Sequence, residues 1–269
     1  MMLDFMMYLP LGVIAGGLAG LFGIGGGIVI VPVLLVAFEI FQMERDLLVH
    51  LAVGTSLACV VPTALSSLLA HHKKEGVIWP WVIRLTPFLV VGGLLGGYTA
   101  DQLPGDVLTI ILGTFLMVMA FQLFVRNRQY VEAAALKTPS MGVFGVFGLL
   151  LGWVCAMVGI AGGALAIPFF ASYGSGMRRA VGTAAAVGLP TAAAGAVSFV
   201  IAGLDNPGRP ELSIGYVYVP AFLGVVLTST VAARFGARLA HRLDQTVLRR
   251  LFACFLAVLS IRLIWNTVI

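Results

Sequence analysis

Residues 20–32 read Gly-Leu-Phe-Gly-Ile-Gly-Gly-Gly-Ile-Val-Ile-Val-Pro, a glycine cluster inside a long apolar segment, residues 8–40. A second cluster, Gly-Ile-Ala-Gly-Gly at residues 159–163, lies inside the apolar segment 141–173. Each segment has 33 residues, which as one helix would be roughly 50 Å long, against a hydrocarbon core of about 30 Å. We therefore expect each segment to fold back as a hairpin of two half-helices of roughly 14 residues, with the glycines at its tip.

The composition places the rest of the chain in a bilayer as well. Of 269 residues, 60% are hydrophobic and 10% charged, whereas a soluble domain carries roughly 25% charged residues. Six further apolar segments are each about one bilayer long. They are residues 50–70, 79–100, 106–125, 180–202, 214–233 and 247–266. The sequence thus predicts an all-α polytopic membrane protein.

The two glycine segments each begin a copy of one larger unit. With a shift of 136 residues, identical residues meet at Gly23, Ile24, Gly26, Gly27 and Pro32. The next span matches too, with Val-Gly-Thr at residues 53–55 and again at 181–183. We therefore expect a tandem duplication, with repeat 1 over residues 1–126, a cytoplasmic linker over 127–140 and repeat 2 over 141–269.

The basic residues indicate whether the repeat is parallel or inverted. If every segment crosses the membrane once, the 16 Lys and Arg divide evenly between the two sides. If segment 141–173 enters and leaves on one side, only Arg45, Arg209 and Arg262 lie opposite the other thirteen. Basic loops face the cytoplasm. We therefore expect two inverted repeats, each with a glycine-broken hairpin plus three transmembrane helices, with both termini outside the cytoplasm.

The glycine tips have the properties of an anion site. A helix that starts at such a tip leaves its first N–H groups without partners and carries partial positive charge there, and glycine admits close approach of a ligand. The alternative is that the glycines only let helices pack closely. We expect the substrate at Gly25, Gly26, Gly27, Ala161, Gly162 and Gly163, with Gly23, Pro32, Gly159 and Pro168 as structural hinges.

Three hydroxyl residues follow the two hairpins at equivalent places. Thr55, Ser56 and Thr183 lie near the start of the next span in each half. Their hydroxyls could donate to the same anion. They could equally bond to a carbonyl of their own helix, as Ser and Thr often do in membrane helices. The residue pattern leaves both interpretations open.

The sequence shows no pattern that indicates catalysis, metal binding or a proton relay. Cys59, Cys155 and Cys254 lie in apolar runs without Cys/His spacing and are expected in the core. We expect no catalytic residue, no metal site and no cofactor. The middle of each predicted span lacks the Asp, Glu or His that a proton relay normally needs. The expected partners are a small anionic substrate and the lipid bilayer, without nucleic acid, and a homo-oligomer remains open.

The residues just quoted resemble the sulfite exporter TauE/SafE family. The similarity is strongest over residues 20–32, recurs over 159–168, and extends over about residues 8–265. It implies an inner-membrane permease for sulfite, organosulfonates or related sulfur anions. The second half departs from the first at Ala161, which stands where the first half has glycine, and at Ala184, which stands in the place of serine. We expect a secondary transporter; an uncoupled anion channel and an intramembrane enzyme are the alternatives.

Overall fold

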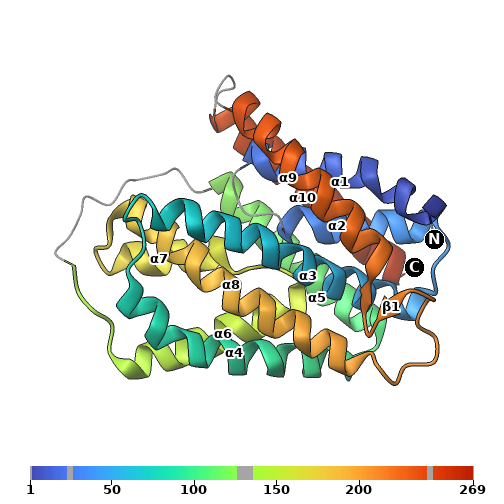
Figure 1. The fold of residues 1–269 in the computed structure, drawn as a ribbon, viewed down its shortest axis with the longest axis horizontal. Helices are drawn as coiled ribbons and strands as arrows, with labels where there is room; N and C mark the ends of the chain where they lie inside the picture. Colours follow the sequence, from blue (N-terminus) through green and yellow to red (C-terminus); the bar gives the residue numbers. More distant parts are fainter. Residues whose placement is uncertain (1, 23–26, 126–135, 241–244, 269) are drawn as a thin grey trace.

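The computed structural model describes residues 2–22, 27–125, 136–240 and 245–268, which are almost entirely helical (Figure 1). Its helices in chain order are α1 (Met2–Phe22), α2 (Gly27–Ile40), α3 (Arg45–His72), α4 (Trp79–Asp101), α5 (Gly105–Val125), α6 (Met141–Val158), α7 (Gly163–Ser172), α8 (Gly176–Ala202), α9 (Val219–Ala240) and α10 (Gln245–Val268). A short antiparallel pair of strands, β1 (Ser213–Ile214) and β2 (Val217–Tyr218), precedes α9.

Six stretches in these helices are long and apolar enough to cross a membrane, which confirms the all-α polytopic class. They are Asp46–His72, Trp79–Asp101, Gly105–Val125, Met141–Val158, Gly176–Ala202 and Arg250–Thr267. Five coincide with predicted one-bilayer spans. The sixth lies in α6, which was expected to be a shorter arm of a hairpin, whereas α9 contributes only the shorter apolar stretch Val219–Ser229.

The outer faces of the long helices are strongly apolar. Ile83 on α4 and Phe121 on α5 are each 67% exposed, and Val146 on α6 and Trp265 on α10 are similarly open. A soluble monomer rarely exposes so much contiguous apolar surface. Lipid therefore covers this apolar surface. The helices can lie in lipid because their main-chain N–H and C=O groups bond to each other within each helix.

The first helix of each half packs against a helix of the other half. α1 packs along α9, and α6, its counterpart by the sequence repeat, packs along α4. Glycine makes both contacts close: a β-carbon on Gly16 would lie 2.4 Å from Cα of Ser229, and one on Gly152 would lie 2.4 Å from the carbonyl oxygen of Leu89. At Gly16 and Gly152, glycine thus allows two helices to pack closely.

The long central helices α3 and α8 pack against each other and run antiparallel. The loop that follows α3 reaches the start of α8, where a β-carbon on Gly182 would lie 2.1 Å from the carbonyl oxygen of Gly76. The loop that follows α8 returns to α3, where a β-carbon on Gly54 would lie 2.6 Å from the carbonyl oxygen of Tyr216. Figure 1 shows the start of α1 and the end of α10 beside β1, at the α8-loop end of the molecule.

The arms of the second long segment are unequal, since α6 has 18 residues and α7 has 10, against roughly 14 expected for each. The left-handed Gly159, not the length of the apolar run, ends α6. In the first segment α2 has the expected 14 residues, and α1 has 21 because it begins at Met2, ahead of residue 8. Pro32 and Pro168 both lie inside helices, so neither proline is the point of the break.

Candidate functional site

The second glycine turn begins where α6 ends. Gly159 has a left-handed backbone (φ 79°), and the N–H of Ile160 donates to the carbonyl of Cys155 at 3.0 Å. The N–H of Gly159 also reaches the carbonyl of Ala156 at 3.3 Å. This pair of bonds is the Schellman arrangement, in which glycine supplies the positive φ at lowest cost. Gly159 therefore ends α6, as a hinge residue should.

The turn finishes at Gly162, which caps the start of α7. Gly162 also has a positive φ of 75°, and its carbonyl accepts from Leu165 and Ala166 at 3.1 and 2.9 Å. Within the described residues, the N–H groups of Gly162 and Gly163 make no main-chain hydrogen bond. A β-carbon added to Gly163 would meet no atom within 4 Å. Among the described residues, the start of α7 thus presents amide hydrogens that have no main-chain acceptor, and no atom of another segment fills the space beside Gly163.

The start of α2 reaches the second glycine turn. Gly23, Gly25 and Gly26 lie outside the described residues, so the comparison rests on Gly27, where α2 begins. A β-carbon on Gly27 would lie 2.9 Å from Cα of Ile160 and 3.0 Å from the carbonyl oxygen of Gly159. The start of α2 therefore abuts the turn between α6 and α7.

Two side chains support the second turn. The hydroxyl of Ser56 on α3 donates to the carbonyl oxygen of Gly159 at 2.9 Å, and Ser56 is fully buried. Cys155 presents its sulfur to the turn, because a β-carbon on Gly162 would lie 3.0 Å from Sγ. Ala161, the counterpart of glycine in the first half, packs its side chain and carbonyl against Gly188 of α8. The turn is thus held by α3, α6 and α8.

Thr55 and Thr183 make hydrogen bonds that the sequence did not predict. The Thr55 hydroxyl oxygen accepts from the main-chain N–H of Tyr218 at 3.0 Å, and the Thr183 oxygen accepts from that of Ile78 at 3.0 Å. Both threonines are fully buried. Each joins its helix to the segment before α9 or α4. Their hydroxyl hydrogens remain able to donate, since these bonds use only the oxygen as acceptor.

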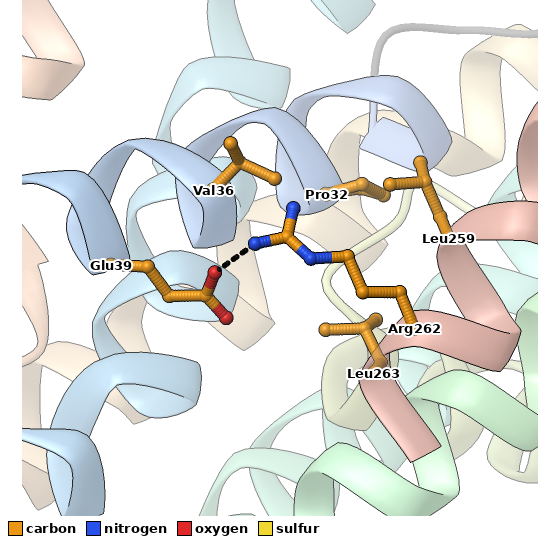
Figure 2. Close-up of a pocket in the computed structure, with 6 residues that line it drawn as sticks. All are labelled: Pro32, Val36, Glu39, Leu259, Arg262 and Leu263. Carbon is orange, nitrogen blue, oxygen red and sulfur yellow. Dashed lines mark hydrogen bonds and ion pairs between the residues drawn. The ribbon is translucent and has the colours of Figure 1, made fainter. Parts of the chain in front are cut away.

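One pocket lies between α2 and α10, away from the glycine turns (Figure 2). Glu39 and Arg262 meet across it at 2.7 Å, with side chains 33% and 48% exposed. An ion pair so open to its surroundings contributes at most about 1 kcal/mol, and its charges cancel locally. Pro32, a predicted hinge, lines the pocket. The pair joins the end of the first hairpin to the last helix and offers no net charge to an anion.

A buried polar cluster near β1 was missed by the sequence reasoning. His50 bonds to the carbonyl of Ala100 at 3.0 Å, and Tyr216 bonds to Asp101 at 2.7 Å and to Asn206 at 3.2 Å. Each of these polar residues lies at the edge of a predicted span or in a loop. The only sequence signal was the presence of His and Asp at span ends, which usually face water. Among the described residues, no group of three His, Cys, Asp or Glu could hold a metal ion.

Helices long enough to cross a bilayer, together with the glycine break between α6 and α7 inside the bundle, are features of a polytopic membrane transporter. The chain belongs to the TauE/SafE sulfite exporter family, whose family model matches residues 8–263. It is similar to a protein of Haemophilus influenzae described as a probable membrane transporter protein, with 34% identity over 258 residues, covering 96% of this chain and 97% of that protein.

More distant relatives carry the same description. A protein of Methanocaldococcus jannaschii is 26% identical over 263 residues, covering 96% of both chains. One from Bacillus subtilis is 23% identical over 285 residues, covering 98% of both. Both are described as probable membrane transporter proteins, so the relatives indicate a transporter rather than an enzyme. No solved structure matches the chain.

Proposed function

We propose that the protein is a secondary transporter that exports a small sulfur-containing anion, such as sulfite or an organosulfonate, across the inner membrane. The description of its family as a sulfite exporter supports this substrate class. The anion binds near the middle of the membrane, at the half-helix starts of both repeats. Export of an anion is favoured by a negative cell interior, by about 2.3 kcal/mol per charge per 100 mV.

The observation that carries the proposal is the start of α7. The N–H groups of Gly162 and Gly163 have no main-chain acceptor among the described residues, and open space adjoins Gly163. The helix dipole adds partial positive charge at this point. Oxyanions bind such helix starts through several N–H groups at once. Gly27 at the start of α2 abuts the same turn, which supports one site shared by two half-helices.

The side chains around the turns divide into two roles in this proposal. Thr55 and Thr183 donate their hydroxyl hydrogens to the anion while their oxygens hold the neighbouring segments. Ser56 already donates its hydrogen to the carbonyl of Gly159, so it positions the turn and has no hydrogen left to donate to the anion. Gly25 and Gly26 complete the site from the first repeat.

The packing supports an inverted repeat. α3 and α8 occupy equivalent places in the two halves and run antiparallel, and each receives the loop that follows the other. The exchange of α1 and α6 between the halves is also mutual. With the basic loops in the cytoplasm, the end of the molecule that carries β1 and both chain ends faces outward.

Uptake into inverted vesicles tests the function, because these vesicles report export as uptake. Vesicles with and without the protein are offered labelled sulfite, sulfate, thiosulfate, sulfoacetate and an amino acid. We expect protein-dependent uptake of sulfite or sulfoacetate that saturates with concentration and is faster when the vesicle interior is positive. Uptake of the amino acid alone would contradict an anion site. Linear, unsaturable flux would favour an uncoupled channel.

A further inference from the structure

Five exposed basic side chains lie around the junction where the loop after α3 meets the start of α8. Figure 1 shows this junction beside α7, at the end of the molecule away from β1. The five side chains come from three segments, residues 73–78, 136–140 and 173–179, in which Glu75 is the one acidic residue. We call this set the basic rim; its members are Lys73, Lys74, Lys137, Arg178 and Arg179.

Hydrogen bonds and close packing hold the three segments of the basic rim together. The guanidinium of Arg178 donates to the carbonyl oxygen of Lys74. A β-carbon on Gly76 would lie 3.7 Å from the carbonyl oxygen of Arg178. The N–H of Lys137 donates at 3.0 Å to the carbonyl oxygen of Tyr173, which caps the end of α7. The fold therefore brings together charges that are up to about a hundred residues apart in the chain.

The protein does not neutralise the charges of the basic rim. In the part of the chain that the structure describes, the ion pair is that of Arg262 with Glu39, and no carboxylate lies within ion-pair distance of a rim side chain. Arg178 spends one N–H on the carbonyl of Lys74, so its other donors remain available. Like charges held close together repel each other and attract an anionic partner.

The opposite end of the molecule carries the reverse charge. There, Gly105 lies against the main chain of Asp46, and Gly208 lies against the side chain of Glu44. Arg209 is the exposed basic residue among the side chains described at this end. The exposed acidic residues there are Glu44, Asp46, Asp106, Asp205 and Glu211. An anionic partner is thus favoured at the basic rim and disfavoured at the β1 end.

The basic rim begins where the candidate membrane spans end. The span in α3 ends at His72, directly before Lys73, and the span in α8 begins at Gly176, two residues before Arg178. Trp79, the first residue of the span in α4, is exposed, and its indole N–H donates to Nδ1 of His72 at 3.2 Å. Tryptophan is enriched at the boundary between lipid and water. The basic rim therefore lies at the level of the lipid headgroups.

Exposed apolar side chains adjoin the basic ones. Leu69 lies four residues before Lys73 and is exposed near the end of α3, and Met177, directly before Arg178, is exposed as well. A small soluble anion makes no use of such neighbours. A lipid does, because its acyl chains remove apolar side chains from water while its headgroup meets the charges.

We propose that the basic rim binds the headgroup of an anionic phospholipid, whose acyl chains pack against Leu69 and Met177. Lys and Arg bind phosphate oxygens through charge-assisted hydrogen bonds, and basic residues just outside a membrane helix attract anionic lipids. The bound lipid stabilises the junction of the α3 loop with α8, because it contacts charges of both segments. This binding does not depend on which anion the protein transports, since it takes place away from the glycine turns.

Native mass spectrometry of the full chain in a neutral detergent tests the proposal without any transported anion. Phosphatidylglycerol, which is anionic, and zwitterionic phosphatidylcholine with the same acyl chains are offered at equal concentration. We expect the parent to retain phosphatidylglycerol with an affinity about fivefold or more above that for phosphatidylcholine. Equal retention of the two lipids overturns the proposal. Glycerol 3-phosphate bound as tightly as the lipid also overturns it, because the rim is then a site for a soluble anion.

Arg179→Gln is the cleanest variant, because the described structure shows no hydrogen bond or ion pair of the Arg179 side chain. The affinity for phosphatidylglycerol should fall by about fivefold for this one charge, and Arg179→Lys should keep most of it. Arg209→Gln is the matched control, because it removes an exposed charge of the same kind at the β1 end. An equal loss in Arg209→Gln overturns the proposal, since net charge would then explain the attraction.

Lys73→Gln and Lys74→Gln provide the same comparison if Arg179→Gln does not fold, because both side chains are exposed in a loop. Arg178→Gln does not, since its guanidinium also holds the loop. Phosphatidylglycerol should raise the unfolding midpoint of the parent more than phosphatidylcholine does, and this difference should shrink in the folded rim variants. If every folded rim variant keeps both the parent affinity and the parent difference in midpoint, the lipid does not bind the basic rim.

Discussion

The hydroxyl oxygen of Thr55 lies 3.0 Å from the main-chain nitrogen of Tyr218 and accepts its hydrogen bond. Thr183 and Ile78 form the same bond at the same distance. Thr183 follows Thr55 by 128 residues, the shift that aligns Val-Gly-Thr at 53–55 with 181–183, and Tyr218 follows Ile78 by 140 residues. Each bond joins a long helix of one half to a segment of the other. The halves therefore hold each other through one repeated contact.

Replacing either threonine by valine should destabilise the protein. Valine keeps the shape and removes the oxygen, so a main-chain N–H loses this acceptor, at a cost of about 1–3 kcal/mol. Thr55→Val should cost more than Thr183→Val, because Tyr218 is buried whereas Ile78 is half-buried. The measurement is the unfolding midpoint in detergent, followed by gel filtration of the folded fraction.

Thr191→Val is the matched control for both variants. Thr191 is equally buried, but its hydroxyl donates to the carbonyl of Val187 in its own helix, so valine there leaves no N–H without its acceptor. Thr55→Ser should also keep most of the stability. If Thr191→Val is as destabilising as Thr55→Val, the bonds between the halves are not what holds these segments.

Ser56→Ala should loosen the second glycine turn. The change removes the donor to the buried carbonyl of Gly159, with an expected loss of about 1 kcal/mol. Anion affinity should fall with it, because the turn presents the amides of the proposed site. Ser66→Ala, at an exposed position of the same helix, should change neither quantity. Isothermal titration with sulfite, beside thermal unfolding, separates the two effects. Unchanged affinity in Ser56→Ala would remove Ser56 from the support of the site.

The helix breaks were predictable from the sequence because they depend on local chemistry. Glycine is the residue that takes the left-handed angles at Gly159 and Gly162 at little cost, and the cluster itself marked the place. The meeting of the two glycine turns, which the repeat suggests, stays a prediction. The unequal lengths of α6 and α7 were not predictable, since an apolar run shows which residues lie in lipid and not where a helix begins or ends.

The buried polar cluster could not be predicted in the same way. Tyr216 and Asp101 are 115 residues apart, and their bond exists only because the loop after α8 folds back over α3 and α4. The acceptor role of Thr55 likewise needs Tyr218, which is 163 residues away. A sequence pattern predicts which residues lie on one helix, whereas these contacts depend on how distant helices pack.

Cysteine labelling of intact cells should show which end of the molecule faces outward. Glu75 and Glu211 are both exposed, and they lie in the loops that follow α3 and α8. In a chain whose three cysteines are replaced by alanine, an impermeant maleimide should label Glu211→Cys but not Glu75→Cys. Opening the membrane should then let the reagent reach Glu75→Cys. The reverse pattern would contradict the proposed orientation.

The cysteine-free chain is itself informative. Cys59 and Cys155 are buried and Cys254 is exposed on α10, and no base or metal-binding group accompanies them among the described residues. Transport by the cysteine-free chain should therefore be close to that of the parent. Loss of flux in a folded, inserted protein would point to Cys155, whose sulfur lies against the Gly162 turn.

Gly163→Ala is the sharpest test of the proposed anion site. A methyl group there would meet no atom of another described segment within 4 Å, and no positive φ opposes it, so the fold should keep its stability. The same methyl would stand where the anion approaches the free amides at the start of α7. We expect anion affinity to fall by about tenfold or more, on the order of the 1–3 kcal/mol at stake when a polar contact is lost.

Two further glycines make the result interpretable. Gly142→Ala, near the start of α6, also adds a methyl to open space and should change neither stability nor affinity. Gly162→Ala forces alanine to a φ of 75° beside the sulfur of Cys155, so it should lower stability by about 1–3 kcal/mol through strain alone. A loss of anion affinity in Gly162→Ala therefore does not separate a lost contact with the anion from backbone strain. If Gly163→Ala binds sulfite and sulfoacetate as tightly as the parent, the anion does not lie against the start of α7. Threonine hydroxyls would then be the donors to test next, since their hydrogens can still reach a ligand while their oxygens hold the two halves together.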